Sequence, residues 1–152
     1  MQKFWPLIVL GVVGLATLAL LTPRDEDGKK DGDKKGPIRT DRVTELVKED
    51  IKEGDGDEVQ AGDRLEVHYV GTRYKDGVKF DSSRDRGEPF PVTIGVGQVI
   101  PGWDQGVPGM KVGGIRKLII PARLAYAERG AGAKIPPDTD LQFEIEVVKK
   151  LN

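Results

Sequence analysis

The stretch between Phe80 and Trp103 gathers aromatic, apolar and polar side chains without an evident nucleophile. Its two informative blocks read FDSSRDRGEPF and VIPGW. Asp81, Ser82 and Ser83 are residue types found in hydrolytic sites, but serines this close in sequence usually bond the backbone of turns. We therefore expect this segment to support chemistry that needs no covalent intermediate.

The composition excludes several classes of function. The chain has one histidine, His68, and no cysteine, so it lacks the usual ligands of zinc and iron–sulfur sites. Asp31 and Asp33 begin a calcium-loop pattern, but Lys35 and Arg42 stand where oxygen ligands are required. A formal net charge of -1 gives no basic excess for phosphates. The sequence predicts no metal, no cofactor and no nucleic-acid partner.

The first 22 residues have the composition of a membrane segment. No charged residue occurs from Phe4 to Leu21, and a helix of about 18 apolar residues spans roughly 27 Å, close to the hydrocarbon thickness of a bilayer. A buried helix of a soluble domain would show a polar face. Thr17 and Ala19 have the small-residue spacing of a cleavage site, but the apolar run continues beyond them. We expect residues 1–22 to form an uncleaved single-pass transmembrane anchor, with a cleaved signal segment as the alternative.

Residues 23–42 are rich in Asp, Lys and Gly and poor in apolar residues, which predicts a charged flexible linker. Lysine and arginine are more frequent after the apolar run than before it, and this distribution favours a cytoplasmic domain. The very short N-terminal tail is instead typical of an export signal. We expect the domain to be extracytoplasmic; the alternatives are the cytoplasmic face and export after cleavage.

Residues 43–152 show the period-two alternation of strands with one buried face. The Asp76-Gly77 pair is a hairpin signal. The strands that we predict cover residues 44–51, 64–69, 69–74, 78–81, 90–94, 117–121 and 141–147.

A helix is expected only between residues 101 and 110, where Gly102, Gly106 and Pro108 would keep it short. The sequence therefore predicts an α+β fold, in which a mainly antiparallel sheet is covered by one short helix.

Three blocks, in order, carry a resemblance to a known family. They read VHYVGTRYKDGVKFDSSRDRGEPF, GQVIPGWDQGVPGMKVGG and IPPDTDLQFEIEVVK. The chain resembles the FK506-binding-protein family of peptidyl-prolyl isomerases over about residues 43–151. That family has an antiparallel sheet of five or six strands wrapped around one short helix, in agreement with the pattern above.

The resemblance implies an apolar pocket with polar groups at its mouth. It implies catalytic roles for Tyr69, for the Asp81 carboxylate, and for the Ile100 N–H and Tyr126 hydroxyl as donors to substrate carbonyls. Trp103 would form the floor beneath a substrate proline. The other substrate-binding residues implied are Phe80, Arg86, Phe90, Gln98, Val99, Ile135 and Phe143, and Arg86 would also hold Asp81 and Tyr69 in place.

The implied activity is rotation about X-Pro peptide bonds in protein substrates, which assists folding. This rotation crosses a barrier of about 18–20 kcal/mol without breaking a covalent bond, and so needs no nucleophile. The implied ligands are proline-containing polypeptides and FK506-like macrolides. The alternative is a proline-segment binding module or chaperone with incidental isomerase activity.

The sequence departs from the family pattern on one rim of the implied pocket. Ala127 stands where the family usually has glycine, and Ala131 and Lys134 replace a histidine and an apolar residue. Gln98 replaces a common acidic residue. We expect the pocket chemistry to be retained while substrate preference and macrolide affinity differ.

Overall fold

The computed structural model describes residues 42–152 of the chain. The predicted anchor over residues 1–22, and the predicted linker apart from its last residue, lie outside the described residues. Within residues 42–152, no helix is both long enough and apolar enough to cross a membrane.

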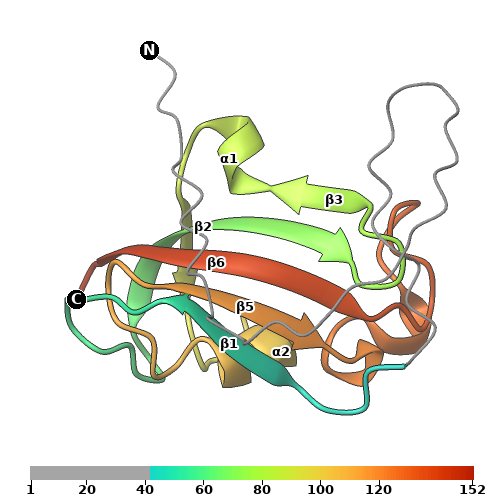
Figure 1. Cartoon of the computed structure of the whole chain (residues 1–152), viewed down its shortest axis with the longest axis horizontal. Coiled ribbons are helices and arrows are strands. Elements are labelled where there is room, and N and C mark those ends of the chain that lie inside the picture. The colour runs from blue at the N-terminus through green and yellow to red at the C-terminus, as the bar shows by residue number, and fades with distance from the viewer. Residues whose placement is uncertain (1–41) are drawn as a thin grey trace, which may run out of the picture. The chain divides into compact units, whose positions relative to one another are not determined.

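A six-stranded antiparallel sheet forms the body of the domain (Figure 1). Five of the strands lie side by side in the order β1, β5, β6, β2, β3, and β4 pairs with β2. The predicted α+β class and the count of five to six strands are therefore confirmed. The strands are β1 (Val47–Lys52), β2 (Arg64–Arg73), β3 (Lys79–Ser82), β4 (Phe90–Thr93), β5 (Ile115–Ile120) and β6 (Leu141–Lys150).

The pairing of the long strands β2 and β6 sets the centre of the core. Alternate residues of β2 are buried, as the period-two pattern predicts. The register places Tyr69 opposite Ile145 and Gly71 opposite Phe143. A Cβ at Gly71 would lie 2.7 Å from Phe80 Cζ and 2.8 Å from Phe143 Cε1. Only glycine leaves room here for aromatic rings that come from β3 and β6.

Four short helical segments connect the strands. The predicted helix is α2 (Pro101–Gly106), which begins with a proline at its first turn, where the missing N–H costs no hydrogen bond. Within residues 43–152 the sequence predicts only this one helix, and it does not predict the single turn α1 (Ser83–Arg86), because four residues carry no helical period. The other two are the 3-10 turns η1 (Ala122–Leu124) and η2 (Ala127–Arg129).

Helix α2 packs directly on β5. A Cβ at Gly102 would lie 2.4 Å from Ile120 Cγ2, and one at Gly106 would lie 2.6 Å from Leu118 Cδ1. The end of the helix is fastened by the buried Arg116, whose Nη1 donates to Gly106 O at 2.8 Å. Close packing and this hydrogen bond together fix how the helix presents its other face.

We expect Gly102→Ala to lower the free energy of unfolding by about 1–2 kcal/mol. The added methyl raises helix propensity by up to about 1 kcal/mol, but overpacking against the fully buried Ile120 costs about 1–3 kcal/mol. Urea unfolding followed by circular dichroism measures the difference. Gln105→Ala, on the exposed side of the same helix, is the matched control and should not destabilise. A Gly102→Ala variant as stable as the parent would contradict this packing.

Candidate functional site

An open pocket of about 640 Å³ lies between the inner face of the sheet, α2 and the neighbouring loops. Its floor and walls come from β2, β3, β4, α2 and β6, and its mouth is formed by α1 and by the segments before α2 and η2. The lining residues are Tyr69, Phe80, Asp81, Arg86, Phe90, Gly97, Gln98, Val99, Ile100, Trp103, Tyr126 and Phe143. The structure thus brings together every predicted site residue except Ile135.

Ile135 belongs to the core and not to the pocket lining. Its side chain is 5% exposed and packs within the main apolar cluster. Its backbone carbonyl accepts a hydrogen bond from Ala131 N at 2.8 Å, closing the loop that follows η2. Ile135 therefore supports one side of the pocket without lining it, while its contact with a substrate stays a prediction.

The apolar part of the pocket is a set of aromatic rings packed edge to face. Tyr69 meets Phe90 at 5.6 Å between ring centroids and Trp103 at 5.2 Å. Phe143 meets Trp103 at 5.3 Å and Phe80 at 5.5 Å. Interplanar angles of 76–89° in these four pairs match the preferred quadrupole geometry. Each ring is held by at least one other, so the walls are preformed.

Trp103 lies at the floor and is 4% exposed. Its indole Nε1 is buried and has no hydrogen-bond partner within residues 42–152. Because this nitrogen is buried, the part of the ring that faces the pocket is carbon. Such an apolar surface suits an aliphatic ring better than a charged or hydrogen-bonding group.

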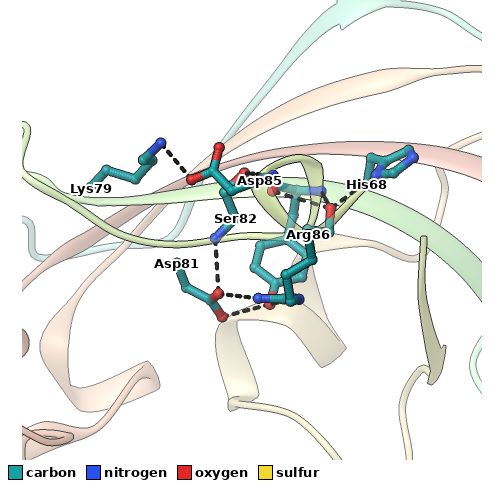
Figure 2. Close-up of polar contacts among 8 residues, drawn as sticks. His68, Lys79, Asp81, Ser82, Asp85 and Arg86 are labelled. Atoms are coloured by element: carbon teal, nitrogen blue, oxygen red, sulfur yellow. Dashed lines mark hydrogen bonds and ion pairs between the residues drawn. The ribbon is translucent and has the colours of Figure 1, made fainter. Parts of the chain in front are cut away.

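Tyr69, Asp81 and Arg86 form a polar triad that lines one edge of the pocket, and Figure 2 shows Arg86 pointing toward Asp81. Tyr69 Oη donates to Asp81 Oδ2 at 2.6 Å, and Arg86 Nη1 donates to Asp81 Oδ1 at 2.6 Å. Arg86 Nη2 also donates to Tyr69 Oη at 2.9 Å. The predicted role of Arg86 in holding Asp81 and Tyr69 is confirmed by these contacts.

The triad fixes the protonation states at this edge. Partial burial opposes ionisation of Asp81, but hydrogen bonds from Tyr69 and Arg86 outweigh it and lower the Asp81 pKa. Burial, together with the hydrogen bond to Asp81, raises the pKa of Tyr69. Burial also raises the pKa of Tyr126, and the Asp81 charge adds to this effect. At neutral pH the carboxylate is ionised and both hydroxyls keep their protons.

Helix α1 carries Arg86 and is anchored by its N-cap, Ser82, and its first residue, Ser83. Ser82 caps the helix by accepting from Asp85 N, and Ser83 Oγ accepts from Tyr69 N at 2.8 Å. Ser83 Oγ also contacts His68 Nδ1 at 3.0 Å (Figure 2). Both serines bond the backbone, as predicted, and do not form a hydrolytic triad.

Two groups at the mouth have hydrogen-bonding capacity to spare. The Ile100 N–H, just before α2, and the Tyr126 hydroxyl both lack a partner within the described part of the chain. Tyr126 is 38% exposed. The site therefore offers two donors above an apolar floor.

Asp104 is a site residue that the sequence did not reveal. Its carboxylate accepts from Gly95 N at 2.7 Å and from Gly97 N at 2.9 Å. Gly95 and Gly97 have φ values of 82° and 78°, a conformation that favours glycine. The Gly-Val-Gly sequence indicates a tight loop, but it does not show which side chain accepts hydrogen bonds from the loop N–H groups. Asp104 thereby fixes the loop that leads to Ile100.

Comparisons with known proteins agree with this geometry. The model of the FKBP-type peptidyl-prolyl cis-trans isomerase family matches residues 56–148. An FK506-binding protein of Neisseria meningitidis serogroup A is 53% identical over 104 residues, which cover 68% of this chain and 94% of the relative. FK506-binding protein 2 of Dictyostelium discoideum is 45% identical and covers 93% of this chain and 92% of its own length. The crystal structure of AtFKBP13 superposes with a TM-score of 0.65 at 45% identity, covering 70% of this chain and 93% of that one.

We expect the ionised Asp81 to stabilise the domain above pH ~4, the ordinary pKa of an unfolded Asp. Because the folded pKa is lower, this contribution is lost as the pH falls through that lower value. The Asp81→Asn variant has no carboxyl group at this position, so it lacks this pH-dependent contribution to stability. In urea unfolding between pH 7 and 3, the stability gap between parent and variant should be constant above about pH 5 and should narrow in acid. A gap that widened in acid would contradict the lowered pKa.

Proposed function

Because the chain belongs to the family of FKBP-type peptidyl-prolyl cis-trans isomerases, we propose that the aromatic pocket is the site where it rotates X-Pro bonds. The observation that carries this proposal is the juxtaposition of the apolar Trp103 floor with two donors, Ile100 N–H and Tyr126 Oη, that have no partner among residues 42–152. No group in the pocket is arranged as a nucleophile, and the reaction needs none.

The physical task is to ease rotation about a partial double bond. Unaided X-Pro isomerisation takes tens to hundreds of seconds because twisting the amide removes its resonance. The planar amide is the more charge-separated form, so transfer from water to an apolar pocket disfavours the ground state relative to the twisted state. The proline ring packs on Trp103, whose surroundings supply no competing hydrogen bond.

The mouth groups hold the substrate while the bond turns. The Ile100 N–H is fixed at the start of α2. The Tyr126 hydroxyl is protonated at neutral pH, and burial raises its pKa further above the ordinary value. Donors set at fixed positions grip substrate carbonyls without reorganising during the reaction. The ionised Asp81, itself held by Tyr69 and Arg86, provides the negative edge of the pocket.

Tyr126→Phe should lower kcat/KM for a proline peptide by about three- to tenfold, the equivalent of one hydrogen bond. The rate of cis–trans relaxation of the peptide measures the effect in the full chain. Tyr74→Phe removes a hydroxyl outside the pocket and is the matched control, expected to keep the parent rate. Equal rates for Tyr126→Phe and the parent would rule out Tyr126 as a donor.

The same variants separate catalysis from simple holding of proline segments. A holding module would keep suppressing the aggregation of a proline-free client after Tyr126→Phe or Asp81→Ala, with no link to isomerase rate.

We also propose that an FK506-like macrolide occupies this pocket and competes with the peptide, as the names of the relatives suggest. Binding would change Trp103 fluorescence, since Trp103 forms the floor.

We further propose that residues 1–22 anchor the enzyme in a membrane, with the catalytic domain on the extracytoplasmic side. The uncharged run from Phe4 to Leu21 supports the anchor. The match to the Dictyostelium relative spans 93% of the chain and so extends into this N-terminal region. Residues 23–42 would serve as the linker, and the clients would be proline-containing proteins near the membrane surface.

Deletion of residues 1–22 should move the protein from the membrane fraction to the soluble fraction without loss of specific activity. Alkaline carbonate extraction distinguishes the full chain, which should resist it, from peripheral binding. In sealed right-side-out vesicles, protease added outside should digest the domain if it is extracytoplasmic. Full protection until the membrane is permeabilised would assign the domain to the opposite side.

A further inference from the structure

The four residues before β1, residues 43–46, form a strap that lies against the segment leading to Tyr126. Val43 N donates to Asp140 Oδ2 at 3.0 Å. Arg123 Nη2 donates to Thr44 O at 3.0 Å and contacts the Glu45 carboxylate at 3.1 Å. Leu46 packs against the core. The strap is therefore tied at both of its polar residues and at its apolar end.

Asp140 joins the strap to η1. Its second oxygen, Oδ1, accepts from Ala122 N at 2.8 Å. The N-cap residue of η1 is Pro121, which supplies no side-chain cap, so Asp140 satisfies the first N–H of this turn from another part of the chain. One carboxylate thus binds the strap and the start of η1 at the same time.

Tyr126 lies between η1, which Asp140 holds, and a second hydrogen bond to residues 138–140. Ala127 O accepts from Asp138 N at 2.8 Å. Tyr126 itself is partly exposed, and no group in residues 42–152 holds its hydroxyl. The position of this hydroxyl above the pocket therefore depends on its backbone, which residues 138–140 fix on both sides.

We propose that Asp140 is a positioning residue for catalysis, and that together with the strap it sets the place of the Tyr126 hydroxyl. This inference rests on the proposed role of Tyr126 as a donor. Single hydrogen bonds contribute modestly to net stability, so their loss leaves the sheet folded, whereas a displacement of about 1 Å at a reacting group costs much rate. The strap belongs to the catalytic unit and is not merely the end of the linker.

The test is a double-mutant cycle between Asp140→Ala and Tyr126→Phe in the full chain, with kcat/KM for a proline peptide as the readout. We expect Asp140→Ala alone to lower kcat/KM by about three- to tenfold. In the Tyr126→Phe background it should cause less than about a twofold further loss, since the group that it positions is already absent. Asp57→Ala removes an exposed carboxylate before β2 and is the control for loss of charge.

Arg123→Met keeps the proposal testable if Asp140→Ala does not fold. Arg123 is exposed and its side chain bonds only to the strap. Arg123→Met should therefore lower kcat/KM in the parent but not in the Tyr126→Phe background. Arg129→Met, in η2, is the matched control. Two results would overturn the positioning role while leaving the proposed function intact. In the first, the loss of kcat/KM caused by Asp140→Ala or Arg123→Met is as large in the Tyr126→Phe background as in the parent. In the second, neither folded variant loses any kcat/KM. If Tyr126→Phe itself caused no loss, the donor role and this inference would both fall.

Discussion

The close approach of α2 to β5 leaves no room for a side chain at two positions of the helix. Gly102 and Gly106 face Ile120 and Leu118 at distances that a Cβ could not occupy. Trp103 lies between the two glycines in the helix. Because the helix backbone packs closely on the sheet, the Trp103 ring lies against Tyr69 and Phe143. The floor of the pocket is thus an extension of the hydrophobic core, and it has the rigidity of that core.

The mouth of the pocket is built differently, because loops and single turns have few apolar contacts to hold them. Three carboxylates take over this function, and each accepts more than one hydrogen bond. Asp104 holds the loop before Ile100, Asp140 holds η1 and the strap, and Asp81 holds Arg86 and Tyr69. Hydrogen bonds to a charged acceptor are roughly twice as strong as neutral ones, which helps to offset the entropy lost when a loop is ordered.

Sequence periodicity was sufficient for the strands and the hairpin but not for the segments that complete the site. The alternation of apolar and polar residues around Leu65 and Val67 depends only on one face of the strand being buried, so the sequence alone predicts this strand. The opening strand begins at Val47 and not at Thr44, because Val43 N and Thr44 O bond to the side chains of Asp140 and Arg123 and not to a neighbouring strand. Ile135 packs in the core and does not line the pocket, which no local pattern shows because an apolar residue beside a pocket can face either the core or the ligand. The pairing of Gly71 with Phe143 depends on register across distant strands, which no local pattern specifies.

Ala127 shows how these constraints act together beside the catalytic hydroxyl. Its φ of 48° lies in the left-handed region, where an L-residue pays roughly 1–2 kcal/mol relative to glycine, and the family usually places glycine here. The conformation persists because Ala127 O is held by Asp138 N and the preceding turn is capped by Asp140. At a positive φ, an alanine destabilises the folded turn relative to glycine. The hydrogen bonds from residues 138–140 must therefore offset this strain to keep the backbone beside Tyr126 in place.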